Sequence, residues 1–306
     1  MVQKDSIDNK IIIICGPTAS SKSALAISLA KFLDTEIISA DSLTVYKGLD
    51  IGTAKPTLSE RNTVKHHLID VVDAKSTFSV GDYREIALPI VKDIINKGKI
   101  PIICGGTGFY INSILYDYSY GKSGANLEIR EKFMKIAEEK GADFVYEELK
   151  KVDPLSAKKI HVNDKKRVIR ALEIYYGGTK KSDIIDDLTP VFNYSAYTVG
   201  FDRKTLYYRI DERVEKMFSD GLEQEVKGLI DSGVTFDDQC MQGIGYKEFC
   251  EYFTGEISLE ELKTRIKLNT CHYAKRQITF FKKLPDLITL TPDSIDNMVK
   301  IITENL

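Results

Sequence analysis

The sequence has no long hydrophobic run. Its longest stretch of apolar residues is the five from Ile11 to Cys15, whereas a helix that spans a membrane needs about 20. The opening segment MVQKDSIDNK is polar and has no apolar stretch of the kind that signal peptides carry. We therefore expect neither a signal peptide nor a membrane partner.

Cysteines are also few, and they are scattered. The five of them, at positions 15, 104, 240, 250 and 271, include no C-x-x-C pair. The pattern indicates neither a disulfide framework nor a zinc site, so a reducing, cytoplasmic setting is expected. His66 and His67 likewise lack the spacing of metal ligands, and we assign them no role.

A strong net charge is absent too. The chain carries a net charge of −2 with a pI near 6.2, which does not by itself mark a nucleic-acid binder. Basic residues are instead concentrated locally. Residues 263–283 hold seven Lys or Arg and no acid, and residues 158–170 hold six against the single acid Asp164. Such patches bind anions, although solvated helix faces would give the same pattern.

What is present over residues 1–117 is an alternation of short apolar runs with helical patterns. We predict strands at 11–15, 36–40, 67–71 and 100–104, with helices after the first strand and over 83–96. Strands that are apolar on both faces and separated by helices form a parallel sheet covered on both sides. The fold class expected is α/β, with a P-loop NTPase-like parallel sheet core.

The pattern changes over residues 118–192, where charge density rises and helical periodicity dominates, so we predict an inserted all-helical lobe. Residues 193–306 continue the core. They carry a strand pattern at 197–201, a helix over 202–217 capped by Asp202, and a long basic helix over 260–283.

A phosphate-binding loop is predicted directly after the first strand. The segment GPTASSKS at 16–23 nearly matches G-x-x-x-x-G-K-[ST], with Gly16, Lys22 and Ser23 in place and Ser21 where the second glycine is usual. In such loops backbone N–H groups and a lysine hold the phosphate, and the hydroxyl binds Mg²⁺. If position 21 needs a positive φ, serine there costs about 1–2 kcal/mol. The alternative is an accidental turn before a helix.

Two further segments follow predicted strands and should lie on the same edge of the sheet. Asp41 follows the second strand and is suited to act as a general base, as a magnesium ligand or as a helix cap. The turn GGTG at 105–108 follows the strand at 100–104 and offers backbone donors or a close-approach surface.

Two helices carry basic residues at helical spacing. Arg209 and Arg213 stand one turn apart and suit a diphosphate, unless they are simply surface arginines beside Asp211 and Glu212. On the last basic helix, the side chains expected on one face are Arg265, Asn269, His272 and Arg276. With aromatic residues between them, these side chains suit a nucleic-acid backbone.

These segments together resemble one family. GPTASSKSALA, ADSLTVYKGLDIGTAKP, HHLIDVVD, FSVGDYRE, PIICGGTGFYINSIL, VNDKKRVIRALEIYYGG, DRKTLYYRIDERVEKM, QGIGYKEF and YAKRQITFFKK occur in this order from residue 11 to residue 283. The chain is similar over nearly its whole length to the bacterial tRNA dimethylallyltransferases.

The resemblance implies a reaction. Dimethylallyl diphosphate would donate its five-carbon group to the exocyclic N6 amine of the adenine 3′ to the anticodon, with Mg²⁺ assisting and pyrophosphate leaving. It implies Asp41 as the general base, Lys22 and Arg209 as the charges on the leaving group with Arg213 as a second candidate, and Ser23 on the metal. The residues that would cradle the diphosphate are Gly16, Pro17, Thr18, Ala19, Ser20, Ser21, Lys22 and Ser23.

The resemblance also implies contacts with the anticodon stem-loop of the tRNA, whose target base must be flipped out of its stack. The residues that match are Thr18, Asp41, Ser42, Leu43, Thr44, Thr107, Lys166, Arg167, Arg170, Gln242, Gly245, Lys247 and Arg276. The chain departs from the family pattern at Ser21, and at Gln242 and Lys247, where basic residues, often arginine, are common.

Two other functions fit parts of the pattern. An adenylate isopentenyltransferase shares this core but acts on a free nucleotide, for which the helical lobe and basic patches would be unnecessary. A P-loop kinase would consume ATP and bind it tightly. A non-catalytic nucleotide switch is less favoured, because the guanine-reading N-K-x-D motif is absent. A monomer is expected, because one chain with two lobes is enough to clasp a tRNA.

Overall fold

The structure, a computed structural model, describes residues 9–117, 126–185 and 187–306. Residues 1–8, where no signal peptide was expected, and residues 118–125, the first of the predicted lobe, lie outside the described residues. The chain divides into a core unit, Met1–Leu115 with Val191–Leu306, and a helical unit, Tyr116–Pro190. In the described ranges, no helix has both the length and the hydrophobicity needed to cross a membrane.

The core unit is built on one six-stranded sheet with the strand order β3-β2-β4-β1-β5-β6. Every strand pair is parallel. The strands are β1 (Lys10–Cys15), β2 (Ile37–Ser39), β3 (His66–His67), β4 (Ile102–Gly105), β5 (Asn193–Val199) and β6 (Leu287–Leu290). The fold class predicted from the sequence is therefore confirmed.

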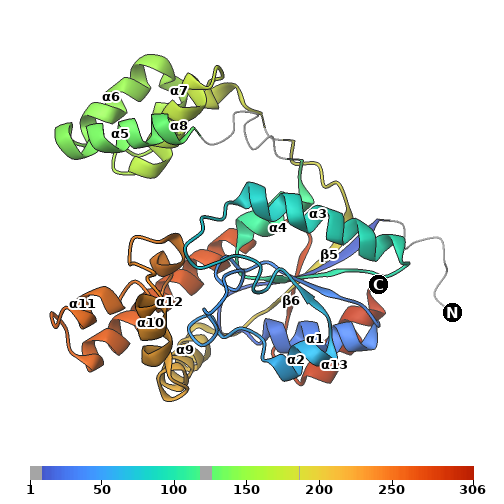
Figure 1. Ribbon diagram of the computed structural model, residues 1–306. Coiled ribbons are helices and arrows are strands. Elements are labelled where there is room, and N and C mark those ends of the chain that lie inside the picture. Colours follow the sequence, from blue (N-terminus) through green and yellow to red (C-terminus); the bar gives the residue numbers. More distant parts are fainter. Residues whose placement is uncertain (1–8, 118–125, 186) are drawn as a thin grey trace. The chain divides into compact units, whose positions relative to one another are not determined.

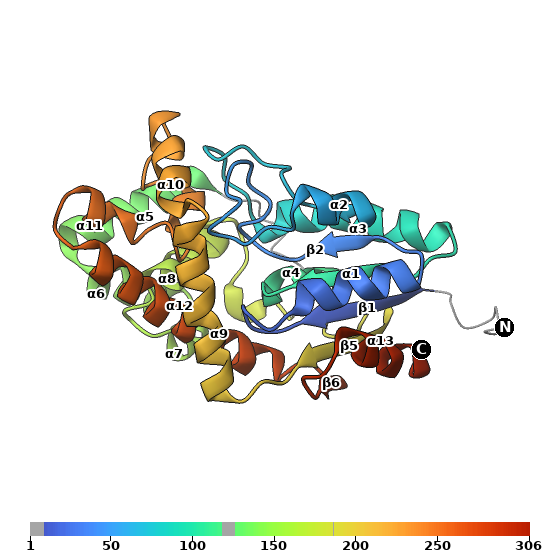
Figure 2. The same ribbon diagram turned by 90° about the horizontal axis from the view of Figure 1, so that it is seen from below.

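Helices cover both faces of this sheet, as Figures 1 and 2 show. One face carries α1 (Lys22–Phe32), α2 (Leu58–Thr63) and α13 (Ile295–Glu304), and the other carries α3 (Val80–Asn96) and α4 (Gly108–Leu115). Beyond the sheet lie α9 (Arg203–Ser219), α10 (Leu222–Asp231), α11 (Phe249–Phe253) and α12 (Leu259–Phe281).

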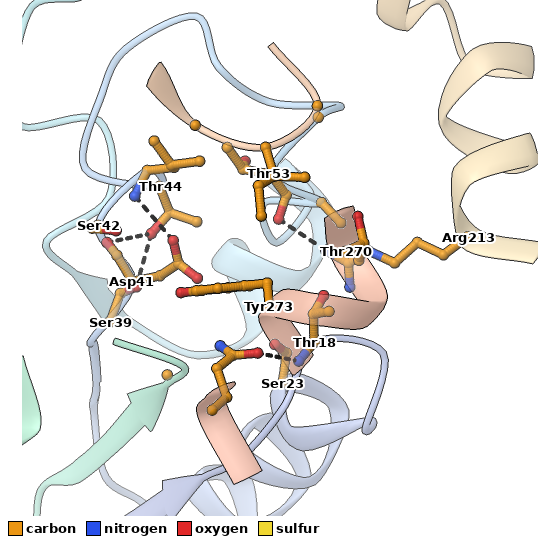
Figure 3. Close-up of a pocket in the computed structure, with 18 of the residues that line it drawn as sticks. Thr18, Ser23, Ser39, Asp41, Ser42, Thr44, Thr53, Arg213, Thr270 and Tyr273 are labelled. Carbon is orange, nitrogen blue, oxygen red and sulfur yellow. Dashed lines mark hydrogen bonds between the residues drawn. The ribbon is translucent and has the colours of Figure 1, made fainter. Parts of the chain in front are cut away.

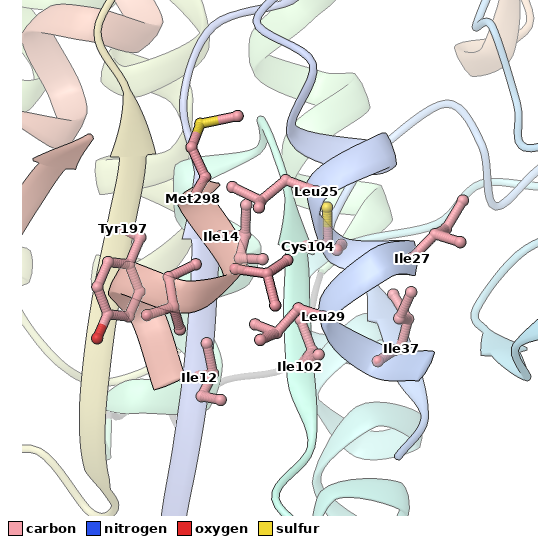
Figure 4. Packing of buried hydrophobic residues seen from close by; sticks show 14 of the residues in the cluster. Ile12, Ile14, Leu25, Ile27, Leu29, Ile37, Ile102, Cys104, Tyr197 and Met298 are labelled. Atoms are coloured by element: carbon pink, nitrogen blue, oxygen red, sulfur yellow. The ribbon is translucent and has the colours of Figure 1, made fainter. Parts of the chain in front are cut away.

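One hydrophobic core cluster lies between β1, β4 and β5 on one side and α1 and α13 on the other (Figure 4). Ile12 and Ile14 of β1 and Leu25 and Leu29 of α1 are fully buried in it. The isoleucines of β1 are buried on both faces of the sheet. The sequence of this strand is therefore a continuous apolar run, without alternating polar residues. The packing fixes the end of β1 from which the phosphate loop starts.

Three strand predictions need correction. The strand expected at 67–71 ends at His67, because Leu68 and Asp70 take left-handed φ angles of 60° and 58°. The strand expected at 197–201 begins earlier, at Asn193, where it pairs with Lys10 of β1 despite its polar sequence. The edge strand β6 was not predicted, because only Leu290 in it is buried and the strand has no apolar run.

The helical unit contains α5 (Leu127–Lys140), α6 (Ala142–Val152), α7 (Pro154–Lys159) and α8 (Lys165–Tyr176), with a hydrophobic core of its own. Glu173 of α8 is buried there and accepts hydrogen bonds from Arg130 and from the backbone of Asn126. Asp153 is also buried and accepts from the backbone N–H groups of Ser156 and Ser182. The contacts of Glu173 with Asn126 and Arg130, and of Asp153 with Ser182, join segments that are far apart in the sequence.

Candidate active site

Three loops follow β1, β2 and β4 at the edge of the sheet where parallel strands end. Two of them are in direct contact at Gly105, where a Cβ atom would lie 2.0 Å from the carbonyl oxygen of Ala40. Thr107 completes the connection, because its N–H donates to Ala40 O at 3.0 Å and its Oγ1 accepts from Ser42 N at 3.0 Å. Only glycine fits at position 105, and the contact fixes the loop that carries Asp41.

The loop after β1 has the backbone of a phosphate-binding loop. Gly16 has φ 137°, and a Cβ there would meet Thr198 Oγ1 at 2.5 Å. Ser21 has φ 62° and ψ 13° and is the N-cap of α1, so the position usually held by glycine does take the left-handed conformation. The first N–H groups of α1 have no intrahelical acceptors, which makes this end of the helix suited to an anion.

Ser21 makes a contact that glycine cannot make. The guanidinium of Arg209 donates to Ser21 Oγ at 2.6 Å and to the carbonyl oxygen of Ala19 at 2.8 Å. It also lies over the ring of Phe201, 4.8 Å from the centroid. Arg209 is thus held in one orientation against the loop, and the hydrogen bond from its guanidinium offsets part of the backbone strain at Ser21.

A cavity of about 450 Å³ opens beside these loops (Figure 3). Many of the residues predicted from the sequence line it: Thr18, Lys22, Ser23, Asp41, Ser42, Leu43, Thr44, Arg213, Gln242, Gly245, Lys247 and Arg276. The predicted residues of the core unit that do not line the cavity include Gly16, Pro17, Ala19, Ser20, Ser21, Thr107, Arg209, Arg265, Asn269 and His272. Segments from five parts of the chain therefore meet at one cavity.

Of the Lys and Arg side chains that line this cavity, those of Lys22 and Arg213 are half-buried, whereas those of Lys247 and Arg276 are exposed. Lys22 Nζ donates to the carbonyl oxygen of Pro17 at 3.1 Å, and the Arg213 guanidinium donates to the carbonyl oxygen of Thr53 at 3.1 Å. Burial lowers the pKa of Lys22, and the neighbouring charge of Arg213 adds to this effect. Burial also lowers the pKa of Arg213, while the charge of Asp41 opposes the shift. Two partly desolvated cations held by backbone carbonyls favour the binding of a polyanion.

Asp41 is the carboxylate on the other side of the cavity, half-buried, with its Oδ1 accepting from Leu43 N at 3.0 Å. Tyr273 of α12 points toward it in Figure 3. Burial, together with the charge of Asp41, raises the pKa of Tyr273 to about 12. The backbone N–H of Leu43 thus orients one oxygen of the carboxylate, and Asp41 faces the cavity.

Gln277 and Tyr273 were not predicted as site residues. The side chain of Gln277 donates to Gly106 O at 2.9 Å and accepts from Thr18 N at 3.0 Å, so it joins the phosphate loop to the GGTG turn. Both residues lie within the segment YAKRQITFFKK at 273–283. Their role depends on where α12 crosses the loops, for which a single sequence carries no signal.

The residues predicted to contact tRNA lie in both units. Thr44 is buried, with its hydroxyl 3.0 Å from Ser39 Oγ. Gln242 donates to Phe236 O at 2.6 Å, and Arg276 lies exposed on α12. Lys166, Arg167 and Arg170 lie on α8 of the helical unit, the first two exposed and Arg170 paired with Glu173 at 2.8 Å.

Comparison with known proteins places the chain in a family. A model of the IPP transferase family matches residues 44–284. The tRNA dimethylallyltransferase of Acetivibrio thermocellus is 43% identical over 300 residues, covering 97% of this chain and 96% of that protein. That of Bacillus cytotoxicus is 46% identical over 281 residues, covering 91% and 89%.

The chain is also similar to solved structures of tRNA-modifying transferases. The tRNA isopentenylpyrophosphate transferase of Bacillus halodurans superposes with a TM-score of 0.73 at 37% identity, over 97% of this chain and 95% of that one. A eukaryotic dimethylallyltransferase acting on tRNA superposes with a TM-score of 0.84 at 32% identity, over 97% and 77%. With the phosphate loop, Asp41 and the cationic cavity in place, the chain belongs to the IPP transferase family.

Proposed function

We propose that this protein transfers the dimethylallyl group of dimethylallyl diphosphate to the N6 amine of the adenine 3′ to the anticodon in tRNA, releasing pyrophosphate. The observation that carries the proposal is the placement of Asp41 and of the cations Lys22 and Arg213 around one cavity. Relatives that match nearly the whole chain are named tRNA dimethylallyltransferases.

In this proposal the diphosphate binds at the N-terminus of α1. The phosphate loop supplies backbone N–H groups, and Lys22 and Arg213 neutralise the charge that develops as the bond from carbon C1 to the diphosphate oxygen breaks. Arg209 acts from the outer side of the loop through its contacts with Ala19 and Ser21. Pyrophosphate leaves with the electron pair of the broken bond.

The adenine enters the same cavity after flipping out of the anticodon loop. A volume of about 450 Å³ is in the range of small-molecule sites. The N6 nitrogen attacks C1, and Asp41 accepts the proton that the amine loses. Ser42, Leu43, Gln242, Gly245, Lys247 and Arg276 line the cavity, where the flipped base and its neighbours would contact them.

Mg²⁺ is part of the proposal. Among the described residues no group of three or more His, Cys, Asp or Glu side chains is placed to hold a metal ion. Mg²⁺ in phosphate-transfer sites is typically held by one or two protein ligands, substrate phosphates and water. The exposed hydroxyl of Ser23, which lines the cavity, fits that arrangement. When bound, the ion would neutralise charge on the diphosphate.

The decisive experiment is a transfer assay with labelled dimethylallyl diphosphate and, in parallel, unmodified tRNA, AMP or no acceptor. We expect label on the tRNA, and analysis of the modified nucleoside should place it on N6. Label on AMP alone would instead identify an enzyme acting on free nucleotides. The proposal also includes a monomer in a cytoplasmic setting, and size-exclusion chromatography with light scattering tests the monomer.

A further inference from the structure

The cavity wall opposite the phosphate loop is held by a carboxylate outside the cavity. Glu225 lies on α10 and is half-buried. Its Oε2 accepts from the backbone N–H groups of Asp50 at 2.8 Å and Ile51 at 2.7 Å, and its Oε1 accepts from Gly52 N at 3.1 Å. Three consecutive N–H groups that converge on one anion form the kind of concavity that binds phosphates elsewhere.

A tyrosine completes this contact. The hydroxyl of Tyr246 donates to Glu225 Oε1 at 2.7 Å, and its side chain is fully buried. A Cβ atom on Gly52 would lie 2.6 Å from ring atoms of Tyr246, so the ring presses directly on the loop. Burial and the charge of Glu225 raise the pKa of Tyr246 well above its usual range, which keeps the phenol a donor.

The loop held in this way supports one of the cavity cations. Gly52, Thr53 and Ala54 line the cavity, and the carbonyl oxygen of Thr53 accepts the hydrogen bond from Arg213. This contact is visible as a dashed line in Figure 3. The orientation of the Arg213 guanidinium thus depends on the position of a loop whose backbone N–H groups are bound by Glu225.

We propose that Glu225 is a positioning residue for diphosphate binding, which acts by fixing loop 50–54 and through it Arg213. The inference rests on the proposed function in that the anion is taken to be the diphosphate of the prenyl donor. Glu225 touches no substrate in this scheme. Its carboxylate instead binds the backbone N–H groups of residues 50–52. This contact holds in place the carbonyl oxygen of Thr53, which accepts from Arg213.

The test is titration of inorganic pyrophosphate with Mg²⁺ into purified variants by calorimetry. Glu225→Gln presents an amide group to backbone donors and should weaken pyrophosphate binding by about 10-fold, because a charge-assisted contact is lost. Tyr246→Phe should weaken it less. Glu223→Gln is the matched control, since Glu223 lies on the same helix and its carboxylate accepts from Tyr252 OH at 3.2 Å and not from loop 50–54.

A double-mutant cycle separates positioning from general loss of structure. If Glu225 acts through Arg213, then Glu225→Gln should have little further effect on pyrophosphate binding in an Arg213→Ala background. In steady-state assays the KM for dimethylallyl diphosphate should rise while the KM for tRNA stays unchanged. Thermal unfolding of each variant verifies that the fold is retained.

Unchanged pyrophosphate binding in Glu225→Gln, or the same loss in the presence and absence of Arg213, would overturn the inference. The wild-type transfer assay is a separate measurement. A wild-type protein that binds pyrophosphate through Glu225 and Arg213 but modifies no tRNA would refute the proposed function while leaving the positioning role intact.

Discussion

The core unit and the helical unit use their basic residues in different ways. In the core unit, Lys22 and Arg213 donate to backbone carbonyls and face a cavity. In the helical unit, Arg170 and Arg130 both bind the buried carboxylate of Glu173, and Arg167 pairs with Asp164 at 3.3 Å. Basic residues that look alike in the sequence therefore serve a ligand site in one unit and partly serve folding in the other.

The difference follows from how each unit is built. The cavity is formed by loops that come from segments far apart in the chain, and these loops are held by a parallel sheet. In the helical unit, consecutive helices pack on one another, and two of its arginines, Arg167 and Arg170, pair with acids three residues away in sequence. A count of charges along the chain cannot separate these two cases, whereas substitutions can.

The largest effect is expected in the core unit at Asp41. Asp41→Asn keeps the size of the side chain but removes the proton acceptor, so we expect kcat to fall by about 10³-fold. Binding of tRNA, measured by filter binding, should be unchanged. Asp73→Asn is the control, because Asp73 is exposed and forms its ion pair with the exposed Lys47. Near-normal turnover in Asp41→Asn would remove the general-base role.

The second largest effect is expected at the two arginines of α9, and its size should differ between them. Arg213→Ala should lower kcat/KM for dimethylallyl diphosphate by about 10²-fold, because a cation that faces the cavity is lost. Arg209→Ala should lower it by roughly 10-fold, since Arg209 holds the loop from outside. Steady-state kinetics at saturating tRNA measures both. A larger effect for Arg209 would reverse this order and make the outer arginine the main charge on the leaving group.

In the helical unit, the strongest prediction concerns stability. Burial raises the pKa of Asp153, but hydrogen bonds from Ser156 and Ser182 outweigh it and lower the pKa from 3.8 to about 2. This stabilisation is present above pH 3.8 and is lost as the pH falls toward 2. Asp153→Asn should cost about 2 kcal/mol at pH 7.

Urea unfolding followed by circular dichroism measures this cost. The difference between wild type and Asp153→Asn should shrink as the pH is lowered toward 2. Asp143→Asn, an exposed position on α6, is the control and should be nearly neutral. A difference that stays constant with pH would show that the lost contacts do not depend on the charge of Asp153.

The smallest effect is expected for exposed basic residues of α8. The double variant Lys166→Ala with Arg167→Ala should weaken tRNA binding by several fold and reduce the slope of log Kd against log salt by about 2. The kcat at saturating tRNA should stay unchanged. Lys31→Ala, an exposed position at the end of α1, is the control. An unchanged salt slope would exclude this face of α8 from the RNA surface.

Much of the site was accessible from the sequence, because the sequence encodes it locally. The loop with Lys22 and Ser23 directly follows an apolar strand, Asp41 follows the next one, and Arg213 stands one turn from Arg209 on an amphipathic helix. In a parallel sheet the two loops that follow these strands must lie on one edge. The same argument failed for the strand at 67–71, because left-handed residues within an apolar stretch leave no mark in its composition.

Other parts could not be read from the sequence. Gln277 and Tyr273 belong to the site only because α12 crosses the loops, and Glu225 acts through backbone N–H groups of a loop far away in sequence. Hydrogen bonds to backbone atoms do not constrain the residue type on the segment that supplies those atoms. Such long-range contacts therefore leave no complementary pattern in a single sequence.

The contact between Ser21 and Arg209 has a consequence for how this loop can diverge. Glycine at position 21 takes the left-handed conformation at no cost and needs no partner. Serine carries strain there and in return provides an acceptor for Arg209 at 2.6 Å. Substitutions at the two positions should therefore be epistatic: removing the hydroxyl is costly when residue 209 is arginine and nearly neutral when it is not. What the loop requires at position 21 is the left-handed backbone conformation, and not glycine as such.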